Sequence, residues 1–347
     1  MNILILLLML IASIHPLHPS ADFTRKRLTP AYSAATNAMP QYVSCNRHNN
    51  VVAIVNPTAN TVQTFKIQDA YGRLSSAVST QSTGLIPTAV AWSPSGNLLA
   101  VVNWGDDTVQ MFSVDESSGS ITSLVSSRIV GSGPIAISFS PNGRFIAIMN
   151  YYAYGVAVFG VDRDGNVSDQ VGWQNILPNT QGTSIAFSPK WSSSSGGFLV
   201  ATSYQAVQIF KLTRAGILSS VSLQNIGANH ASWSPSGRLL AISTFDGKVS
   251  ILRVSSHGRL SIPLSSQTTT LALNGVAWSP LGNAIAAYSG DSSHSLRIYP
   301  VNSHGKLYRA VQNLDTGAEL LSLAWKPAGN LLLVTTRDGR LKTFTYR

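Results

Sequence analysis

Short apolar segments separated by turn residues run along the whole chain, and their order repeats. In one unit the segment TAVAWS leads into a Ser-Pro-x-Gly turn, the apolar run LLAVV, the alternating segment TVQMFSV and the more polar GSITSLVSS. Alternation with a period of two residues, bounded by Gly, Pro, Ser and Asn, predicts strands, and these segments show no helical periodicity. Each unit therefore predicts four short antiparallel strands.

The repeat has a regular length. One apolar position in the second predicted strand falls at Ala53, Ala100, Ala147, Val200, Ala241, Ala286 and Leu333. The spacings are 47, 47, 53, 41, 45 and 47 residues, which is the length of a propeller blade. We therefore predict an all-β fold, a seven-bladed β-propeller with four-stranded antiparallel blades, as a single domain over residues 22–347.

The turn after the first strand of a unit has a mechanical explanation. Ser93, Pro94 and Gly96 suit a type I β-turn, because proline presets φ at the second position and glycine accepts the exit geometry. Blade one has lost this pattern in CNRHNN, and blade four carries the insertion KWSSSSGG.

The two ends of the chain predict how the ring closes. The seventh unit stops after its third strand, RLKTFTYR, whereas RKRLTPAYS near the start resembles the fourth-strand segments YGRLSSAVS and HGKLYRAVQ. We expect residues near Arg27 to Ser33 to complete the last blade. Pro30 is tolerated there because an outermost strand is an edge.

Composition and the first residues bear on where the protein acts. Of 347 residues, 44% are hydrophobic and 11% charged, which indicates a globular chain with a sizeable core. The apolar run from Ile3 to Ile14 is too short to span a bilayer, so residues 1–21 are interpreted as a secretory signal peptide, with a retained membrane anchor as the alternative. We expect a secreted or periplasmic protein with no transmembrane segment in the mature chain. Cys45 is the only cysteine, so no intrachain disulfide forms.

The units resemble WD-type and YVTN/lactonase-type propeller repeats over essentially the whole predicted domain. VAWSPSGNLLAVVNWGDDTVQMFSVD is similar to the YVTN/lactonase pattern, and ASWSPSGRLLAISTFDGKVSILRV is similar to a WD repeat. The lactonase resemblance implies a Pro-Arg-His run at an inner-strand entry and an Asn-Glu after the next strand. His230 matches the family histidine, but Ala228 and Asn229 replace proline and arginine. Thr244 and Phe245 stand at the Asn-Glu position, so lactone-opening chemistry lacks its anion holder and its carboxylate.

Large aromatic residues follow the second strand of four adjacent blades. Because strands alternate in direction, this turn and the loop entering the first strand lie on the same face of the disc. The residues are Trp104, Tyr151, Tyr204 and Phe245, with Tyr152 and Tyr154 in the loop of Tyr151 and with His230 beside the arc. Exposed aromatic clusters anchor interfaces and stack on sugar rings, so these residues are the candidate site for a protein or glycan partner. The alternative is that they cover the blade ends and stabilise the disc.

The net charge of +10 is concentrated in the C-terminal part of the chain. Residues 200–347 carry fourteen Lys/Arg and five Asp/Glu, against ten and nine in residues 22–199. The candidate basic surface consists of Arg214, Arg238, Arg253, Arg259, Arg297, Lys306 and Lys342. It either meets an anionic surface, such as phosphate, acidic glycan or lipid headgroups, or is ordinary solvated surface. Few aromatic residues interleave with it, which argues against specific nucleic-acid binding.

Motifs for other chemistry are missing from the sequence. There is no phosphate loop, no His-Glu-x-x-His and no cysteine pair, and the Asp-Gly pairs predict hairpin turns rather than calcium ligands. We therefore expect no metal and no cofactor. The sequence predicts an exported, non-enzymatic binding or scaffold module. A lactonase-like hydrolase with its site near the central channel around His230 is the alternative.

Overall fold

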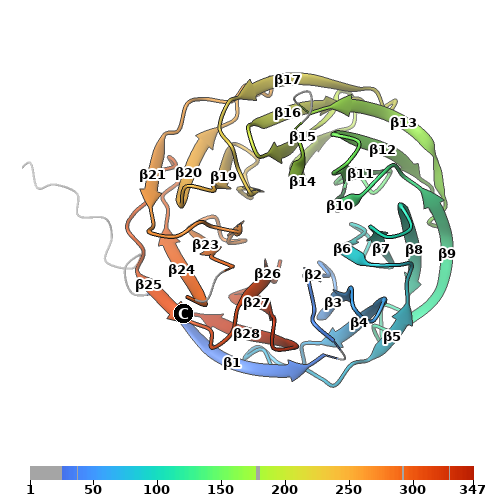
Figure 1. Cartoon of the computed structure of the whole chain (residues 1–347), viewed down its shortest axis with the longest axis horizontal. Helices are drawn as coiled ribbons and strands as arrows, with labels where there is room; N and C mark the ends of the chain where they lie inside the picture. The colour runs from blue at the N-terminus through green and yellow to red at the C-terminus, as the bar shows by residue number, and fades with distance from the viewer. Residues whose placement is uncertain (1–25, 37, 177–179, 291–292, 328) are drawn as a thin grey trace, which may run out of the picture.

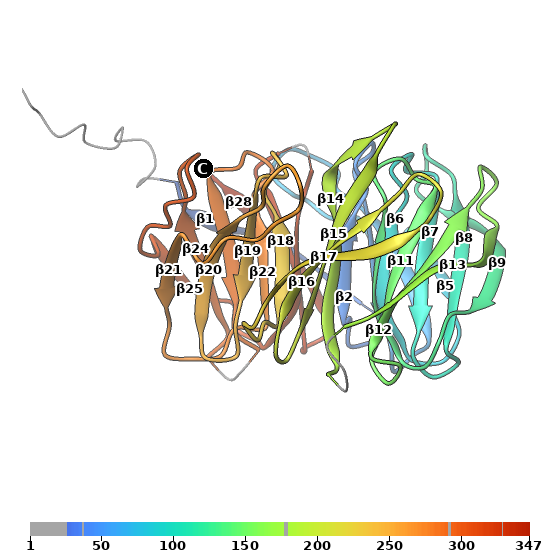
Figure 2. The same cartoon turned by 90° about the horizontal axis from the view of Figure 1, so that it is seen from above.

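Seven four-stranded sheets are arranged as blades around a central axis in the computed structural model (Figure 1). The structure describes residues 26–36, 38–176, 180–290, 293–327 and 329–347, and the predicted signal peptide lies outside them. Within these ranges all regular structure is β, which confirms the predicted propeller. From the side the blades form a disc (Figure 2). Among the described residues, none forms a helix long and apolar enough to cross a membrane.

Each blade runs from an innermost first strand to an outermost fourth strand. The first three blades are β2 (Tyr42–Cys45), β3 (Val51–Asn56), β4 (Thr61–Lys66), β5 (Ser79–Ser82); β6 (Pro87–Trp92), β7 (Leu98–Asn103), β8 (Thr108–Val114), β9 (Ile121–Ile129); and β10 (Pro134–Phe139), β11 (Phe145–Asn150), β12 (Gly155–Val161), β13 (Val167–Asn175). Blades four and five are β14 (Gly182–Ser192), β15 (Gly196–Ser203), β16 (Val207–Leu212), β17 (Leu218–Gln224); and β18 (His230–Trp233), β19 (Leu239–Ser243), β20 (Lys248–Arg253), β21 (Ser265–Thr268). Blades six and seven are β22 (Gly275–Trp278), β23 (Ala284–Tyr288), β24 (Ser295–Pro300), β25 (Gln312–Asp315); and β26 (Leu320–Trp325), β27 (Leu331–Thr336), β28 (Arg340–Tyr346), β1 (Leu28–Ala35).

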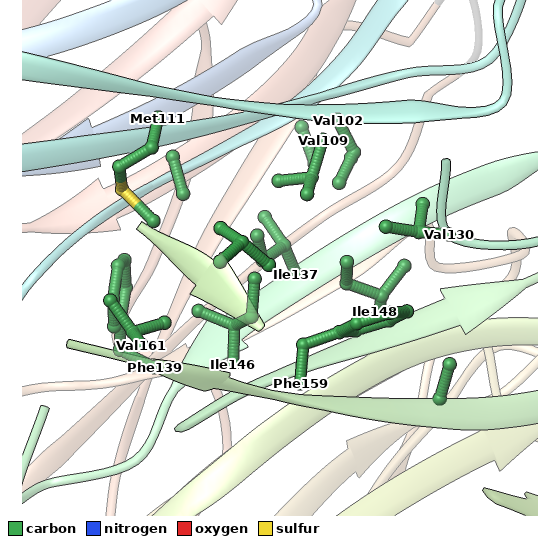
Figure 3. Packing of buried hydrophobic residues seen from close by; sticks show 14 of the residues in the cluster. Val102, Val109, Met111, Val130, Ile137, Phe139, Ile146, Ile148, Phe159 and Val161 are labelled. Atoms are coloured by element: carbon green, nitrogen blue, oxygen red, sulfur yellow. The ribbon is translucent and has the colours of Figure 1, made fainter. Parts of the chain in front are cut away.

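The burial of each strand follows its position in the blade. Every residue of β7 is buried, whereas β9 at the rim exposes most of its side chains. A second strand is covered by neighbouring blades on both faces, which explains its unbroken apolar run. Between blades two and three, Met111, Ile137 and Ile148 belong to one buried cluster (Figure 3). The core is therefore a series of layers between adjacent blades.

The Ser-Pro-x-Gly turns form as predicted. The N–H of Gly96 donates to the carbonyl of Ser93 over 3.0 Å, and Gly96 has a φ of +86°. The Ser93 hydroxyl accepts the N–H of Leu98 at 3.1 Å, which ties the turn to the start of β7. Equivalent bonds close the turns at Gly143, Gly237 and Gly282. We call the face that bears Pro94, Pro141, Pro235 and Pro280 the proline-turn face.

A tryptophan precedes the turn in blades two, five, six and seven, and in three of them its indole N–H joins neighbouring blades. The indole N–H of Trp92 donates to the carbonyl of Ser44 at 3.2 Å, and that of Trp233 donates to the carbonyl of Ala186 at 3.1 Å. Trp325 makes the same bond at 3.2 Å. Each bond leads from one blade to the inner strand of the preceding blade. The recurrence of tryptophan therefore has a structural cause, because the residue fills the core and pairs a carbonyl at the channel wall.

Replacing Trp233 with phenylalanine is expected to lower the free energy of unfolding by about 1–2 kcal/mol, because the Ala186 carbonyl loses its partner. Trp278 provides a matched control, since its indole nitrogen is buried without a hydrogen-bond partner among the described residues. Trp278→Phe should cost less than Trp233→Phe in urea unfolding, because it removes a similar volume and no hydrogen bond. Equal losses in the two variants would contradict this role for the indole.

The chain closes the ring with its N-terminal strand, as predicted. β1 pairs antiparallel with β28, from Leu28 opposite Tyr346 to Ala35 opposite Arg340. In Figure 1 the blue β1 lies beside the red β28 at the rim. The pairing is interrupted between Pro30 and Tyr32, where proline has no N–H to donate.

The insertion in blade four lengthens its first hairpin. β14 and β15 extend past the usual turn, and Trp191 pairs with Gly197 in the added part. The hairpin projects beyond the neighbouring blades in Figure 2. The spacing of 53 residues in the repeat is therefore taken up on the proline-turn face.

Candidate functional site

The six predicted aromatic residues form one cluster, which we call the aromatic cluster: Trp104, Tyr151, Tyr152, Tyr154, Tyr204 and Phe245. The ring of Trp104 lies 5.4 Å from Tyr151 and 5.1 Å from Tyr152, measured between centroids. The rings of Tyr204 and Phe245 stack at 4.8 Å with an interplanar angle of 23°. We call the surface that bears these residues the aromatic face; it lies opposite the proline-turn face.

Tyr151 links the two halves of the cluster. Burial raises its pKa, and so do the hydrogen bond and charge of Tyr204 and the charge of Tyr154. These effects place the three phenol groups close together. The aromatic face therefore bears two groups of contacting rings, one on blades two and three and one on blades four and five, which approach each other at Tyr151 and Tyr204.

Buried polar groups hold the turns that carry these rings. Asn103, which immediately precedes Trp104, is fully buried, and its side-chain amide donates to Thr108 Oγ1 at 3.1 Å. The N–H of Trp104 donates to the carbonyl of Ile86 at 2.9 Å. In blade three the N–H of Tyr151 donates to the carbonyl of Gly133 at 2.8 Å. The ring positions are thus fixed by backbone contacts between the turn and the loop entering the blade.

The cluster faces solvent. Tyr152 is 55% exposed, Tyr204 46% and Phe245 37%, while Trp104 and Tyr151 are partly buried beneath their neighbours. Tyr154 is also partly buried, so three of the six rings cover the blade ends while the other three are open to solvent.

Two exposed aliphatic residues, which were not predicted from the sequence, adjoin the cluster. Leu85 and Ile86 lie in the loop that enters β6, bonded to the Trp104 turn through their carbonyls. Ile86 has a φ of +53°, which is unusual for a β-branched residue. The only signal in the sequence is two adjacent apolar residues in a loop. They enlarge the apolar part of the aromatic face at blade two.

His230 is the first residue of β18 and lines the central channel. Burial lowers the pKa of His230 to about 4, although a hydrogen bond with the backbone of Val276 opposes the shift. Its Nδ1 is buried and has no hydrogen-bond partner within the described part of the chain. The imidazole is therefore neutral at pH 7, and it is a weak base for catalysis at that pH.

The channel contains a cavity of about 580 Å³ that extends along the first strands to the prolines of the proline-turn face. Tyr42 and His230 stand at its strand-entry end, and Pro94 and Pro235 at the other. Among the described residues that line it there is no carboxylate, and Arg47 supplies a permanent charge. The carboxylate that the lactonase resemblance implies is thus missing from the space as well as from the sequence.

The predicted basic residues do not gather in one place. Arg214, Arg238, Arg259 and Lys306 are exposed in loops of the proline-turn face, with Arg253 exposed at the end of β20. Arg297 lies within β24, and its Nη1 is buried without a partner among the described residues. Lys342 lies 3.5 Å from Asp338 and donates to the carbonyl of Thr316, both on the aromatic face. The sequence placed Lys342 on a third strand, but it did not show that the side chain lies at the end of β28 near the aromatic face.

The part of the chain described by the structure holds no group of three or more His, Cys, Asp or Glu side chains arranged for a metal ion. The Asp-Gly pairs occupy turns: Gly247 and Gly339 donate to the carbonyls of Thr244 and Thr336. Their left-handed φ values, +78° and +74°, explain the glycines.

Two family models match separate parts of the chain. Residues 21–135 match the model described as lactonase, 7-bladed beta-propeller, and residues 231–312 match the anaphase-promoting complex subunit 4 WD40 domain. Each match covers less than half of the chain. No curated protein matches it. The two matches agree with the fold and with the mixed character of the repeats, one part similar to lactonase-type propellers and another similar to WD40 propellers.

Proposed function

We propose that this β-propeller is a binding module that holds a protein partner on its aromatic face. The observation that carries the proposal is the aromatic cluster, which extends over four adjacent blades and presents Tyr152, Tyr204 and Phe245 to solvent. Tyrosine and tryptophan are enriched among the residues that dominate binding energy, because they bury a large area and keep a polar edge. WD40 propellers commonly mediate protein interactions, which supports the same class of function.

The surroundings of the cluster favour a protein over a glycan. Leu85 and Ile86 extend the apolar area beyond the rings, whereas a sugar site needs hydrogen-bonding groups around its stacking platform. Asp106 is exposed in the turn of Trp104, and Asp246 in the turn of Phe245 pairs with the exposed Lys248, so charged groups surround the patch. An apolar centre with a charged margin is the usual composition of a protein interface. The expected partner surface has an apolar centre and polar or charged residues around it.

The double variant Trp104→Ala/Tyr204→Ala is expected to weaken capture of the partner roughly tenfold or more, because it removes one ring from each half of the cluster. The measurement is a pull-down from the native envelope or secreted fraction, followed by titration of the captured protein. Ile217→Ala/Leu281→Ala is the matched control, since both side chains are exposed on the proline-turn face. Equal capture by the wild-type and the aromatic variant would exclude the aromatic face as the binding site.

A lactonase-like hydrolase is the second candidate, favoured by the match of residues 21–135 and by the place of His230 in the channel wall. It predicts hydrolysis of a sugar lactone that is lost in His230→Gln. The neutral, half-buried imidazole and the lack of a lining carboxylate among the described residues weigh against it. Activity that survives in His230→Gln excludes this residue as the catalytic base.

We also propose that the protein acts after export, on the evidence of the apolar run from Ile3 to Ile14. Sequencing the N-terminus of protein isolated from its native source tests this. A mature chain that starts between residues 14 and 22 is the expected result. A chain that retains the run would favour the membrane anchor instead.

A further inference from the structure

The described acidic residues of blades four to seven lie on the aromatic face, together with Lys248, Arg337, Arg340 and Lys342, so only the proline-turn face of these blades is one-sided in charge. These acidic residues all lie in turns, loops or strand ends: Asp246, Asp315, Glu319 and Asp338. The proline-turn face of the same blades carries cations: Lys190, Arg214, Arg238, Arg259, Lys306 and Lys326. Blades one to three differ, because Asp69, Asp115 and Asp162 lie on their proline-turn side. One sector of this face therefore has a one-sided positive potential, which attracts anions.

A cavity of about 600 Å³ lies within this sector. Trp191, Ser192 and Ser195 of the extended β14–β15 hairpin line one side, and Arg238 and Ser255 of blade five line the other. The volume falls in the range of small-molecule sites, about 300–1,000 Å³. The hairpin is longer because of the blade-four insertion, so the cavity is a product of the longest spacing in the repeat.

Two cations line the cavity without a compensating acid. Lys190 and Arg238 are exposed, and neither forms an ion pair within the described residues. A Cβ added at Gly237 would lie 3.2 Å from Cγ of Lys190, so the lysine stem rests against the turn that presents Arg238. Both cations line the same cavity, so an anion bound there would be attracted by two positive charges.

The wall beside these cations is rigid. The ring of Trp191 lies 6.0 Å from Phe145 and 6.3 Å from Phe187, measured between centroids. A Cβ at Gly197 would come within 2.6 Å of Cε3 of Trp191, so a residue without a side chain is needed opposite the ring. The indole thus forms a fixed apolar surface within the same cavity.

We propose that this cavity binds a small organic phosphate, with the phosphate between Lys190 and Arg238 and the carbon skeleton against Trp191. Arginine pairs with phosphate through two parallel N–H donors, and lysine adds a point charge. The Ser195 hydroxyl supplies a further donor at the rim. The site is independent of the aromatic face, which lies on the other side of the disc.

Isothermal titration with phenyl phosphate tests the proposal, with phenol as the probe that lacks the charge. We expect saturable binding of phenyl phosphate, no binding of phenol, and a loss of roughly tenfold or more in affinity in Lys190→Gln/Arg238→Gln. Arg214→Gln/Lys306→Gln is the matched control: it removes the same charge from the same face, at residues outside the cavity lining. All four side chains are exposed, so thermal midpoints should match the wild type.

Equal weakening in the two double variants would overturn the proposal, because it would assign binding to the general field of the face. Unchanged affinity in Lys190→Gln/Arg238→Gln would overturn it as well. Binding to vesicles that contain phosphatidic acid is measured as well, because this lipid headgroup carries the same phosphate group. Binding of these vesicles without binding of phenyl phosphate would show a lipid surface contact and contradict a small-molecule site.

Discussion

A chain that starts at residue 38, and so lacks β1, is expected to lose its cooperative unfolding transition and to melt about 10 °C or more below the intact protein. β1 is the outermost strand of blade seven and pairs with β28 from Leu28 to Ala35, with one interruption between Pro30 and Tyr32. Without it, β28 becomes an exposed edge with unpaired backbone groups. Leu28, 2% exposed, would also leave its cluster with Phe344 and Tyr346.

β1 also joins blade seven to blade six. The side chain of Gln312 in β25 accepts the N–H of Leu28 at 2.6 Å and donates to its carbonyl at 2.8 Å. Deleting β1 therefore also removes the contact between blades six and seven that Gln312 makes with Leu28. The ring is then weakened at blade seven, where the two ends of the chain meet. Circular dichroism during heating gives the melting curve. The control is a chain that starts at residue 26, which keeps every described contact of β1.

If the chains starting at residues 26 and 38 melted at the same temperature, the closure would contribute nothing to stability. Addition of a peptide with the sequence of residues 26–36 separates loss of closure from general misfolding. The peptide should raise the midpoint of the shortened chain, because binding to the native form alone stabilises it.

The fold could be predicted from the sequence because each blade repeats the same turn residues and the same buried strand pattern. Ser93, Pro94 and Gly96 specify a turn by their own backbone preferences, and the run from Leu98 to Val102 specifies a doubly covered strand. Closure of the ring could be predicted because the seventh unit ends after its third strand, whereas the segment near Arg27 to Ser33 resembles a fourth strand. What the sequence did not show was the hydrogen bond from Trp233 to blade four, since it joins residues 47 apart through space.

The candidate site was only partly accessible. The convergence of Trp104, Tyr151 and Tyr204 followed from strand direction, which puts equivalent turns on one face. The contribution of Leu85 and Ile86 depends on a loop conformation that no periodicity encodes. The length of the insertion in blade four was also evident from the sequence. The cavity beside it was not, because it depends on how Trp191 packs.

His230 is expected to make the protein less stable in acid. The folded protein holds the pKa of His230 at about 4, against the ordinary histidine pKa of about 6.5 in the unfolded chain. Between these values the unfolded state takes up a proton that the folded state does not, so the free energy of unfolding falls as pH falls. The loss begins near pH 6.5 and amounts to about 3 kcal/mol at pH 4. Below pH 4 both states are protonated and the effect levels off.

Urea unfolding at pH 7 and at pH 4 in the wild type and in His230→Gln measures this contribution. The variant should lose about 3 kcal/mol less stability than the wild type between the two pH values, whatever its stability at pH 7. His257→Gln is the control, because His257 is exposed in a loop of blade five and should leave the difference unchanged. A drop of the same size in wild type and His230→Gln would mean that acid sensitivity arises elsewhere. The lactone assay on His230→Gln measures catalysis, whereas urea unfolding of the same variant measures stability. Together they separate a catalytic role of the imidazole from its effect on acid stability.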